Sequence, residues 1–232
     1  MSAELDSGQR FRRHRFALAL LPLLATALFA APLIRREVFT FRDHLDYFQP
    51  LRWFTAMQLR AGNLPLWNPY NASGEAWLAN PQTGIFYPPT WMFLALPFDT
   101  AYVLYLLFHV VLLGWSAYLL FSRSVAPGAA MVGAVALMFS GPTLSLLDVS
   151  NNLASLAWLP LALWCAKERA HLRGGAVLAM AFLAGEPFIA AIAALLYVIV
   201  TPRATGIGQR VTTALVAIGV SAIQLFPFLE TL

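Results

Sequence analysis

Two aspartates, Asp43 and Asp46, stand three positions apart shortly after the first apolar stretch of the sequence. If residues 43–47 form a helical turn, this spacing places both carboxylates on one face, where each changes the pKa of the other. A carboxylate beside a membrane can act as a general base on an acceptor hydroxyl, or it can hold a divalent ion near a phosphate. The alternative is that both aspartates are solvated in a polar loop.

An aromatic and proline-rich stretch, GNLPLWNPY, follows at residues 62–70. Its two prolines restrict the backbone. Trp67 and Tyr70 have the amphipathic rings that are common at the head-group level of membranes, and Asn68 before a proline favours a turn. The pattern predicts an ordered loop.

Between the aspartates and this loop, residues 49–61 read as a short helix, with Pro50 in its first turn and Gly62 at its end. At about 100° per residue the helix is amphipathic. Its apolar arc consists of Leu51, Trp53, Phe54 and Met57, and its polar arc of Gln49, Arg52 and Arg60. Such a helix lies along a membrane surface. One interpretation is that its basic edge holds an anionic lipid head group, since arginine binds phosphate well. The alternative is that the helix only caps the bundle.

A membrane domain must position these residues, because the composition is far more apolar than that of a soluble domain. Of 232 residues, 59% are hydrophobic and 11% are charged, and the mean hydropathy is +0.67. The long apolar runs lack the period-two alternation of an outer-membrane barrel, so helices must satisfy the backbone in lipid. We expect an all-α fold, a polytopic transmembrane helical bundle of about six or seven membrane segments, some of them short or re-entrant.

The basic residues set the expected topology, in which a single membrane domain has its N-terminus in the cytoplasm. Its parts are a cytoplasmic N-terminus at 1–15, a first span at 16–34, a long external loop and interfacial segment at 35–98, and the remaining spans at 99–232. Within residues 174–200, a break at Gly185-Glu186-Pro187 leaves ten of the fifteen basic residues inside, whereas a continuous helix leaves eight. The positive-inside rule favours the break.

Several other functional classes lack support. The sequence contains no P-loop, nucleophile elbow, HExxH or CxxC motif, so no metal ligands are assigned. The pI near 9.6 reflects basic residues at the ends of apolar runs, and nucleic-acid binding is not expected. His109, inside an expected span, is predicted to hydrogen-bond a neighbouring helix. A transporter ranks third among the hypotheses, because almost every ionisable residue lies at the end of a span.

A series of motifs in chain order carries a resemblance to a known family. They are Arg42-Asp43, Gln49-Pro50, GNLPLWNPY, Gly74, Leu78-Ala79-Asn80-Pro81-Gln82, Phe86-Tyr87-Pro88-Pro89, His109, Phe139-Ser140-Gly141 and Trp158-Leu159-Pro160. From residue 38 to its end, the chain resembles the N-terminal part of the YfhO-like bacterial membrane proteins. These proteins are placed among the GT-C type glycosyltransferases.

The resemblance implies an inverting transferase of the bacterial cytoplasmic (inner) membrane that serves the cell envelope. It would move a sugar from a polyprenyl-phosphate donor to an acceptor at the outer face. Asp43 matches the expected catalytic carboxylate, and Asp46 is the second candidate. Together with the surface helix, the motifs assign substrate binding to Arg42, Arg52, Arg60, Trp67, Asn68, Tyr70, Asn80, Gln82, Tyr87 and His109. The expected partners are the lipid-linked sugar, membrane lipids and a membrane protein. A divalent cation stays open as a cofactor.

Members of that family are usually much longer, with more spans and further external sequence. The chain is therefore expected to be a fragment or a naturally shortened protein, in which the fold can survive while catalysis is lost. The second hypothesis is a non-catalytic membrane subunit that uses the same loop to dock a partner or a lipid. Replacing Asp43 with Asn separates the two, because only a transferase loses activity.

Overall fold

The computed structural model describes residues 2–35, 37, 43–71 and 73–231, and for residues 2–15 and 17 it describes the backbone only. Within this part of the chain the fold is all-helical, as predicted, and contains no strand. An antiparallel bridge between Asn68 and Glu75 is the one β-type pairing among these residues.

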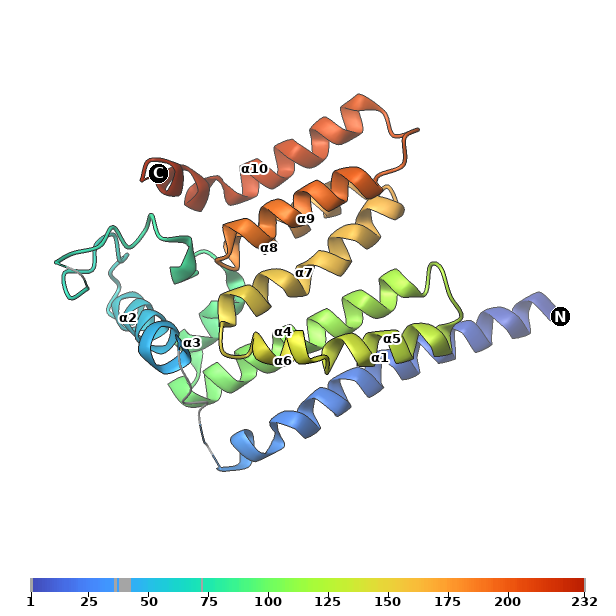
Figure 1. Ribbon diagram of the computed structural model, residues 1–232, viewed down its shortest axis with the longest axis horizontal. Helices are drawn as coiled ribbons and strands as arrows, with labels where there is room; N and C mark the ends of the chain where they lie inside the picture. Colours follow the sequence, from blue (N-terminus) through green and yellow to red (C-terminus); the bar gives the residue numbers. More distant parts are fainter. Residues whose placement is uncertain (1, 36, 38–42, 72, 232) are drawn as a thin grey trace.

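The helices of the bundle run side by side, and successive members point in opposite directions (Figure 1). They are α1 (Ser2–Arg35), α4 (Phe98–Phe121), α5 (Pro127–Met138), α7 (Ser150–Lys167), α8 (His171–Leu183), α9 (Pro187–Val200) and α10 (Ile207–Leu229). Four described stretches are long and apolar enough to cross a membrane: Leu18–Arg35, Phe98–Phe121, Pro127–Ser145 and Ile207–Leu229. The apolar helices α8 and α9 are shorter. These helices are typical of a membrane protein.

The apolar stretch 174–200 is divided between α8 and α9, as predicted. Helix α8 ends at Leu183 and α9 begins at Pro187. Gly185 has φ +108°, a conformation that suits glycine, and proline is tolerated in the first turn of the next helix. The apolar stretch Pro127–Ser145 is divided too, because α5 ends at Met138 and the short α6 (Gly141–Ser145) follows it.

Helix α4 is the centre of one half of the bundle, where it packs against α1, α5 and α7. Trp115 on α4 donates its indole N–H to the carbonyl of Leu18 on α1 at 3.0 Å. Gly114 allows Met138 of α5 to approach closely, since a Cβ there would lie 2.0 Å from the methionine sulfur. In the other half, α7 packs on α8 and α9, and α8 packs on α10.

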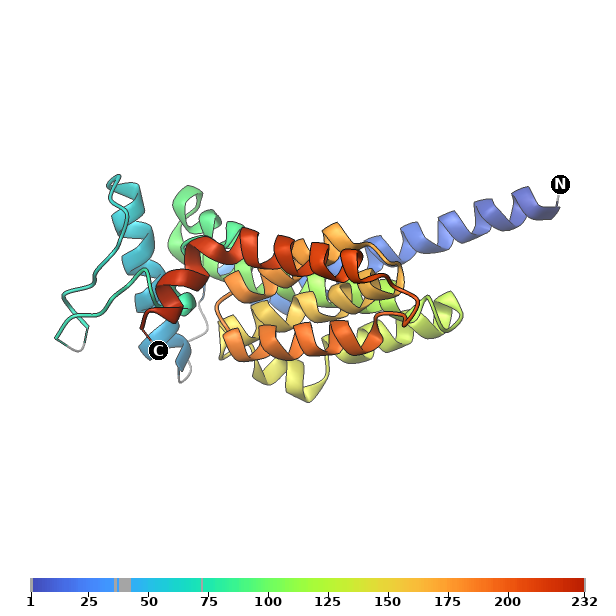
Figure 2. The same cartoon turned by 90° about the horizontal axis from the view of Figure 1, so that it is seen from above.

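Helix α2 (Gln49–Arg60) lies across one end of the bundle, the end that also holds the C-terminus (Figures 1 and 2). It continues the π-helical turn η1 (His44–Phe48) and stops before Gly62, which has φ +79°. The short elements η2 (Pro81–Thr83), η3 (Pro88–Trp91) and α3 (Met92–Ala95) lead from it to α4. The predicted helix at 49–61 is thus confirmed, to within one residue at its end.

The predicted polar face of α2 is wrong at one position. Arg52, expected on the polar arc, is only 2% exposed, while Trp53 of the apolar arc is 55% exposed. Arg52 donates to the carbonyl oxygens of Gln82 at 3.0 Å and Thr83 at 2.5 Å, and to Oδ1 of Asn151 on α7. These acceptors take hydrogen bonds from both terminal nitrogens of the buried guanidinium, and only its Nε lacks a partner among the described residues. The bonds offset much of the cost of turning the arginine inward.

His44 lies fully buried under the start of α2, with its ring 4.3 Å from the ring of Tyr102 between centroids. Burial lowers the pKa of His44 to about 4, although the charge of Asp148 and a hydrogen bond with the backbone of Leu147 act in the opposite direction. The unfolded chain therefore takes up a proton in a range where the folded protein does not.

We expect stability to be unaffected by His44 above pH 6.5, the ordinary pKa of histidine, and to fall as the pH drops from there toward 4. At pH 4.5 the loss is about 2 to 3 kcal/mol. The measurement is the free energy of unfolding against pH for the wild type and His44→Gln. The difference between the two curves isolates the histidine from the titrating carboxylates, and parallel curves would contradict the assignment.

Candidate functional site

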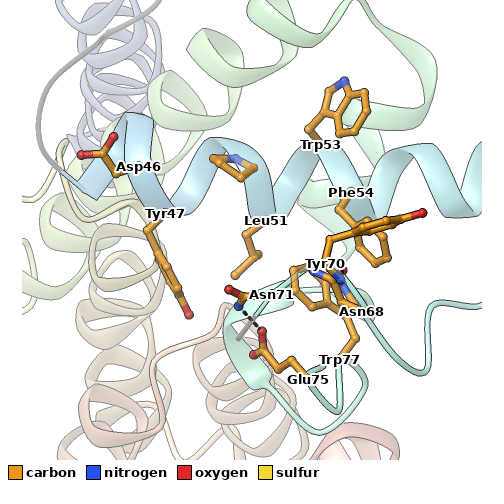
Figure 3. A pocket seen from close by; sticks show the side chains of 11 residues that line it. Asp46, Tyr47, Leu51, Trp53, Phe54, Asn68, Tyr70, Asn71, Glu75 and Trp77 are labelled. Atoms are coloured by element: carbon orange, nitrogen blue, oxygen red, sulfur yellow. Dashed lines mark hydrogen bonds between the residues drawn. The ribbon is translucent and has the colours of Figure 1, made fainter. Parts of the chain in front are cut away.

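A groove of about 320 Å³ lies between η1 with α2 on one side and the loop at 63–77 on the other (Figure 3). The helical side contributes Asp46, Tyr47, Pro50, Leu51, Trp53 and Phe54, and the loop contributes Asn68, Tyr70, Asn71, Glu75 and Trp77. Asp46 stands at one end of the groove, while Tyr70 and Trp77 stand at the other. The volume is near the lower end of the range for small-molecule sites.

Trp77 anchors the loop to α2. Its buried indole N–H donates to the hydroxyl of Thr55 at 2.9 Å, and its ring packs edge-on against Phe54 with 4.8 Å between centroids. Phe54 on α2 and Trp77 on the loop therefore meet in one aromatic wall of the groove. Because both partners are buried, the wall is part of the folded core rather than a mobile surface.

The loop is also ordered within itself, as its prolines predict. Asn68 and Glu75 exchange two backbone hydrogen bonds, each 2.9 Å long, and the side-chain oxygen of Asn68 accepts from the N–H of Tyr70 at 3.0 Å. The ring of Trp67 covers Gly74, where a Cβ would lie 2.1 Å from a ring carbon. The turn predicted at Asn68 is confirmed, and it presents Tyr70 to the groove.

The two carboxylates of the groove differ in their surroundings. Asp46 is exposed on η1. Glu75 receives a hydrogen bond on each oxygen, from the amide of Asn71 at 2.6 Å and from the amide of Asn80 at 2.7 Å. Glu75 is therefore held in one orientation, while Asp46 is free to meet a ligand.

Tyr47 connects the groove to the residues behind it. Its hydroxyl donates to Oε1 of Gln82 at 2.5 Å and accepts from the amide of Asn80 at 3.4 Å. Partial burial, with the nearby charge of Glu75, raises the pKa of Tyr47, while Asn80 and Arg52 act in the opposite direction. The hydroxyl stays protonated at neutral pH and keeps its role as a donor.

The charge of the groove excludes some ligands. Its described lining contains two carboxylates and no lysine, arginine or histidine. A phosphate placed there would be repelled by both acids and would find no cation. Aromatic faces, amides and carboxylates instead suit an uncharged ring that is rich in hydroxyl groups, or a cationic one.

The structure brings together three of the predicted site residues, Asp46, Asn68 and Tyr70, in the lining of the groove. Asn80 and Gln82 stand behind it, where they hold Glu75 and Tyr47. Trp67 lies on the same loop, exposed on one face and packed over Gly74. The groove is thus built mainly from the first external loop of the prediction.

Other predicted residues lie elsewhere. Asp43 is exposed and does not line the groove. Arg52 is buried as described, and Arg60 donates to the carbonyl oxygens of Phe93 at 2.7 Å and Leu96 at 3.0 Å, at the end of α3. Arg42 lies outside the described residues. The predicted basic edge on α2 is therefore wrong for Arg52, whose donors serve the protein itself.

Tyr87 and His109 form a separate buried cluster with Trp158. Nδ1 of His109 lies 2.6 Å from the carbonyl oxygen of Tyr105, which can only accept, so Nδ1 carries the proton and donates. Nε2 therefore accepts from the Tyr87 hydroxyl at 2.7 Å. The indole of Trp158 donates to the same hydroxyl at 2.7 Å. Burial raises the pKa of Tyr87 well above its ordinary value, which keeps this donor protonated. His109 thus bonds a loop tyrosine rather than a neighbouring helix.

The groove also contains residues that the sequence did not single out as site residues, namely Tyr47, Pro50, Leu51, Trp53, Phe54, Asn71, Glu75 and Trp77. One signal was available, because Glu75 is the single acidic residue in the polar loop at 62–80. The aromatic members gave no such signal, since Trp53 and Phe54 have the spacing of an ordinary apolar helix face.

Among the described residues, no group of three or more His, Cys, Asp and Glu side chains is placed to hold a metal ion. Fold and site together define a helical protein with helices long and apolar enough to cross a membrane, and with an aromatic, acidic groove at one end of the bundle. Comparisons with family models, with curated proteins and with solved structures give no match to this chain.

Proposed function

We propose that the chain is a multi-pass protein of the bacterial inner membrane, with its N-terminus in the cytoplasm and α2 at the outer face. The support is the positive-inside rule. The helix ends opposite α2 carry Arg123, Lys167, Arg169, Arg173, Arg203 and Arg210. In this orientation the membrane segments are α1, α4, α5, α7, α8, α9 and α10, and α2 lies along the outer surface. Three of these segments are short, namely α5, α8 and α9.

With α2 at the outer face, the groove between α2 and the loop at 63–77 binds a sugar. The observation that carries this proposal is the composition of its lining, in which Trp53 and Tyr70 provide exposed aromatic faces while amides and carboxylates provide hydrogen-bonding groups. An aromatic ring covers the apolar face of a sugar, and carboxylate oxygens accept from its hydroxyl groups. The rigid loop offers these groups without a large ordering cost on binding.

The reaction class that fits is sugar transfer from a polyprenyl-phosphate donor, as the resemblance to YfhO-like proteins implies. An acceptor hydroxyl would attack the anomeric carbon, Asp46 would take the hydroxyl proton, and polyprenyl phosphate would leave with the bonding electrons. The acidic lining favours the sugar or the acceptor inside the groove, with the phosphate outside it. We assign the base to Asp46 rather than Asp43, because Asp46 alone of the two lines the groove.

Sugar binding tests this proposal directly. We expect a panel of hexoses, titrated against the purified protein, to change its tryptophan fluorescence, with hexose 1-phosphates binding no tighter than the free sugars. Tyr70→Ala should weaken binding about tenfold, a loss of about 1.4 kcal/mol. Because Tyr70 is 84% exposed, the variant should fold normally.

The matched control is Leu64→Ala, an exposed residue of the same loop that does not line the groove. It should bind like the wild type. Tighter binding of the phosphates, or equal loss in both variants, would show that the groove is not a sugar site.

A second candidate is the non-catalytic subunit that docks a membrane partner. The observation that favours it is the apolar surface of the loop, where Leu64, Leu66 and Trp67 are exposed together. Site-specific photo-crosslinking at Leu66 in cells distinguishes the two, because a subunit gives one discrete protein adduct and a monomeric transferase gives none.

A further inference from the structure

A second groove, of about 470 Å³, lies between α9 and α10 with α8 as its floor. Its lining consists of His171, Leu178, Ala194, Tyr197, Val198, Thr201, Arg210, Thr213, Ala214, Ala217 and Ile218. The apolar members continue along α9 and α10, and Val198 and Ile218 are exposed. Since α10 is long and apolar enough to cross a membrane, this groove faces lipid.

Polar groups collect at one end of this groove, where α8 and α10 begin and α9 ends. His171 is only 9% exposed, and its Nε2 has no hydrogen-bond partner within the described part of the chain. Its Nδ1 reaches the hydroxyl of Thr213 only at 3.5 Å, and Tyr197 reaches the same hydroxyl at 3.4 Å. A buried polar atom without a partner is costly, so a ligand that binds it gains free energy.

Arg210 stands at the same end and is weakly held. Its guanidinium donates to the carbonyl oxygens of Pro202 and Thr205 at 3.3 Å and 3.4 Å, both longer than an ordinary hydrogen bond. It lies near the N-terminus of α10, where free backbone N–H groups carry partial positive charge. An arginine there does not stabilise its own helix, but together with the helix end it attracts an anion.

Two glycines of α8 shape the floor. A Cβ at Gly174 would lie 2.4 Å from the hydroxyl of Tyr197, and one at Gly175 would lie 2.6 Å from the carbonyl oxygen of Thr213. Because these glycines have no side chain, α9 and α10 approach α8 closely. This approach brings the hydroxyl groups of Tyr197 and Thr213 beside His171. The polar end is therefore a product of helix packing and not of one helix alone.

We propose that this groove binds one anionic phospholipid, with an acyl chain between α9 and α10 and its phosphate at Arg210 and His171. Charge complementarity selects this occupant, because the described lining contains Arg210 and no acid. The apolar walls accept the chain, and the polar end offers donors to the phosphate oxygens. An uncharged occupant would leave the charge of Arg210 unmatched.

Native mass spectrometry of the purified full chain, titrated with phosphatidylglycerol or phosphatidylcholine of identical acyl chains, tests the proposal. We expect the wild type to bind phosphatidylglycerol at least fivefold more tightly. Arg210→Gln should reduce that affinity about fivefold and leave phosphatidylcholine unchanged, since one basic residue contributes about 1 kcal/mol at an anionic surface. The matched control is Arg203→Gln, an exposed arginine outside the groove, which should change affinity less than twofold.

Two further measurements keep the result decisive. Ala217→Phe, which fills the groove, should abolish retention of the lipid, and inorganic phosphate at millimolar concentration should not compete with it. Equal affinity of the wild type for both lipids would overturn the proposal without any variant. Competition by free phosphate, or equal effects of the two arginine substitutions, would overturn it as well.

Discussion

Replacing Arg52 with methionine is expected to lower the free energy of unfolding by about 3 to 5 kcal/mol. The buried guanidinium joins α2 to η2 and α7 through the carbonyl oxygens of Gln82 and Thr83 and through Asn151. Methionine fills much of the same space but donates nothing, so that the oxygens of Thr83 and Asn151 lose their donor in a buried setting. Reversible unfolding in mixed micelles, followed by circular dichroism, measures the loss.

Arg60→Met is the matched control, because Arg60 belongs to the same helix and also donates to carbonyl oxygens, but is exposed. It should cost less than about 1 kcal/mol. The double variant Arg52→Met with Asn151→Leu should recover part of the loss, since it removes a donor and one of its acceptors together. A loss at Arg52 as small as that at Arg60 would show that the buried arginine does not hold α2 to the bundle.

Asp46→Asn is expected to reduce sugar transfer from a polyprenyl-phosphate donor by 100-fold or more, because general-base catalysis contributes about 10² to 10⁴ in rate. Asparagine keeps the size and the hydrogen-bonding oxygen of the aspartate but cannot take a proton. Sugar affinity should therefore change by less than about threefold, and only the rate should fall. The measurement pairs a transfer assay in membrane vesicles with the fluorescence titration of the same preparation.

Asp43→Asn serves as the control, since Asp43 is exposed and outside the lining of the groove. Its transfer rate should stay within about fivefold of the wild type. The reverse pattern, with loss at Asp43 and activity at Asp46, would return the base to the position that the family resemblance implies. Full activity in both variants, with normal sugar binding, would leave the groove as a binding site without a catalytic carboxylate.

Local features of the fold were predictable because they depend on neighbouring residues. The apolar runs predict helices, since a backbone in lipid must satisfy its own hydrogen bonds. Gly62 and the Gly185-Glu186-Pro187 break end or begin helices through their own backbone preferences, and the structure has those ends where predicted. The ordered loop follows in the same way from its prolines and from the turn at Asn68.

The burial of Arg52 on α2 was not predictable from helical spacing. That reasoning assumes that apolar side chains are buried and charged ones exposed, which fails when a buried charge has acceptors. The acceptors of Arg52 lie 30, 31 and 99 positions away in the chain, so no local pattern contains them. With Arg52 turned inward, Trp53 faces outward, where it becomes a wall of the groove.

The sequence by itself thus determined the helical class, the ends of α2, the break between α8 and α9, and the loop that carries the candidate site. Only the tertiary structure decided that Asp46 rather than Asp43 lines the groove, that Glu75 joins it, and that α2 contributes no arginine to it. The physical reason is the distance along the chain over which each kind of interaction acts. Helix formation and turn chemistry act over a few residues, whereas a site depends on which distant donors and acceptors the packing of helices brings into contact.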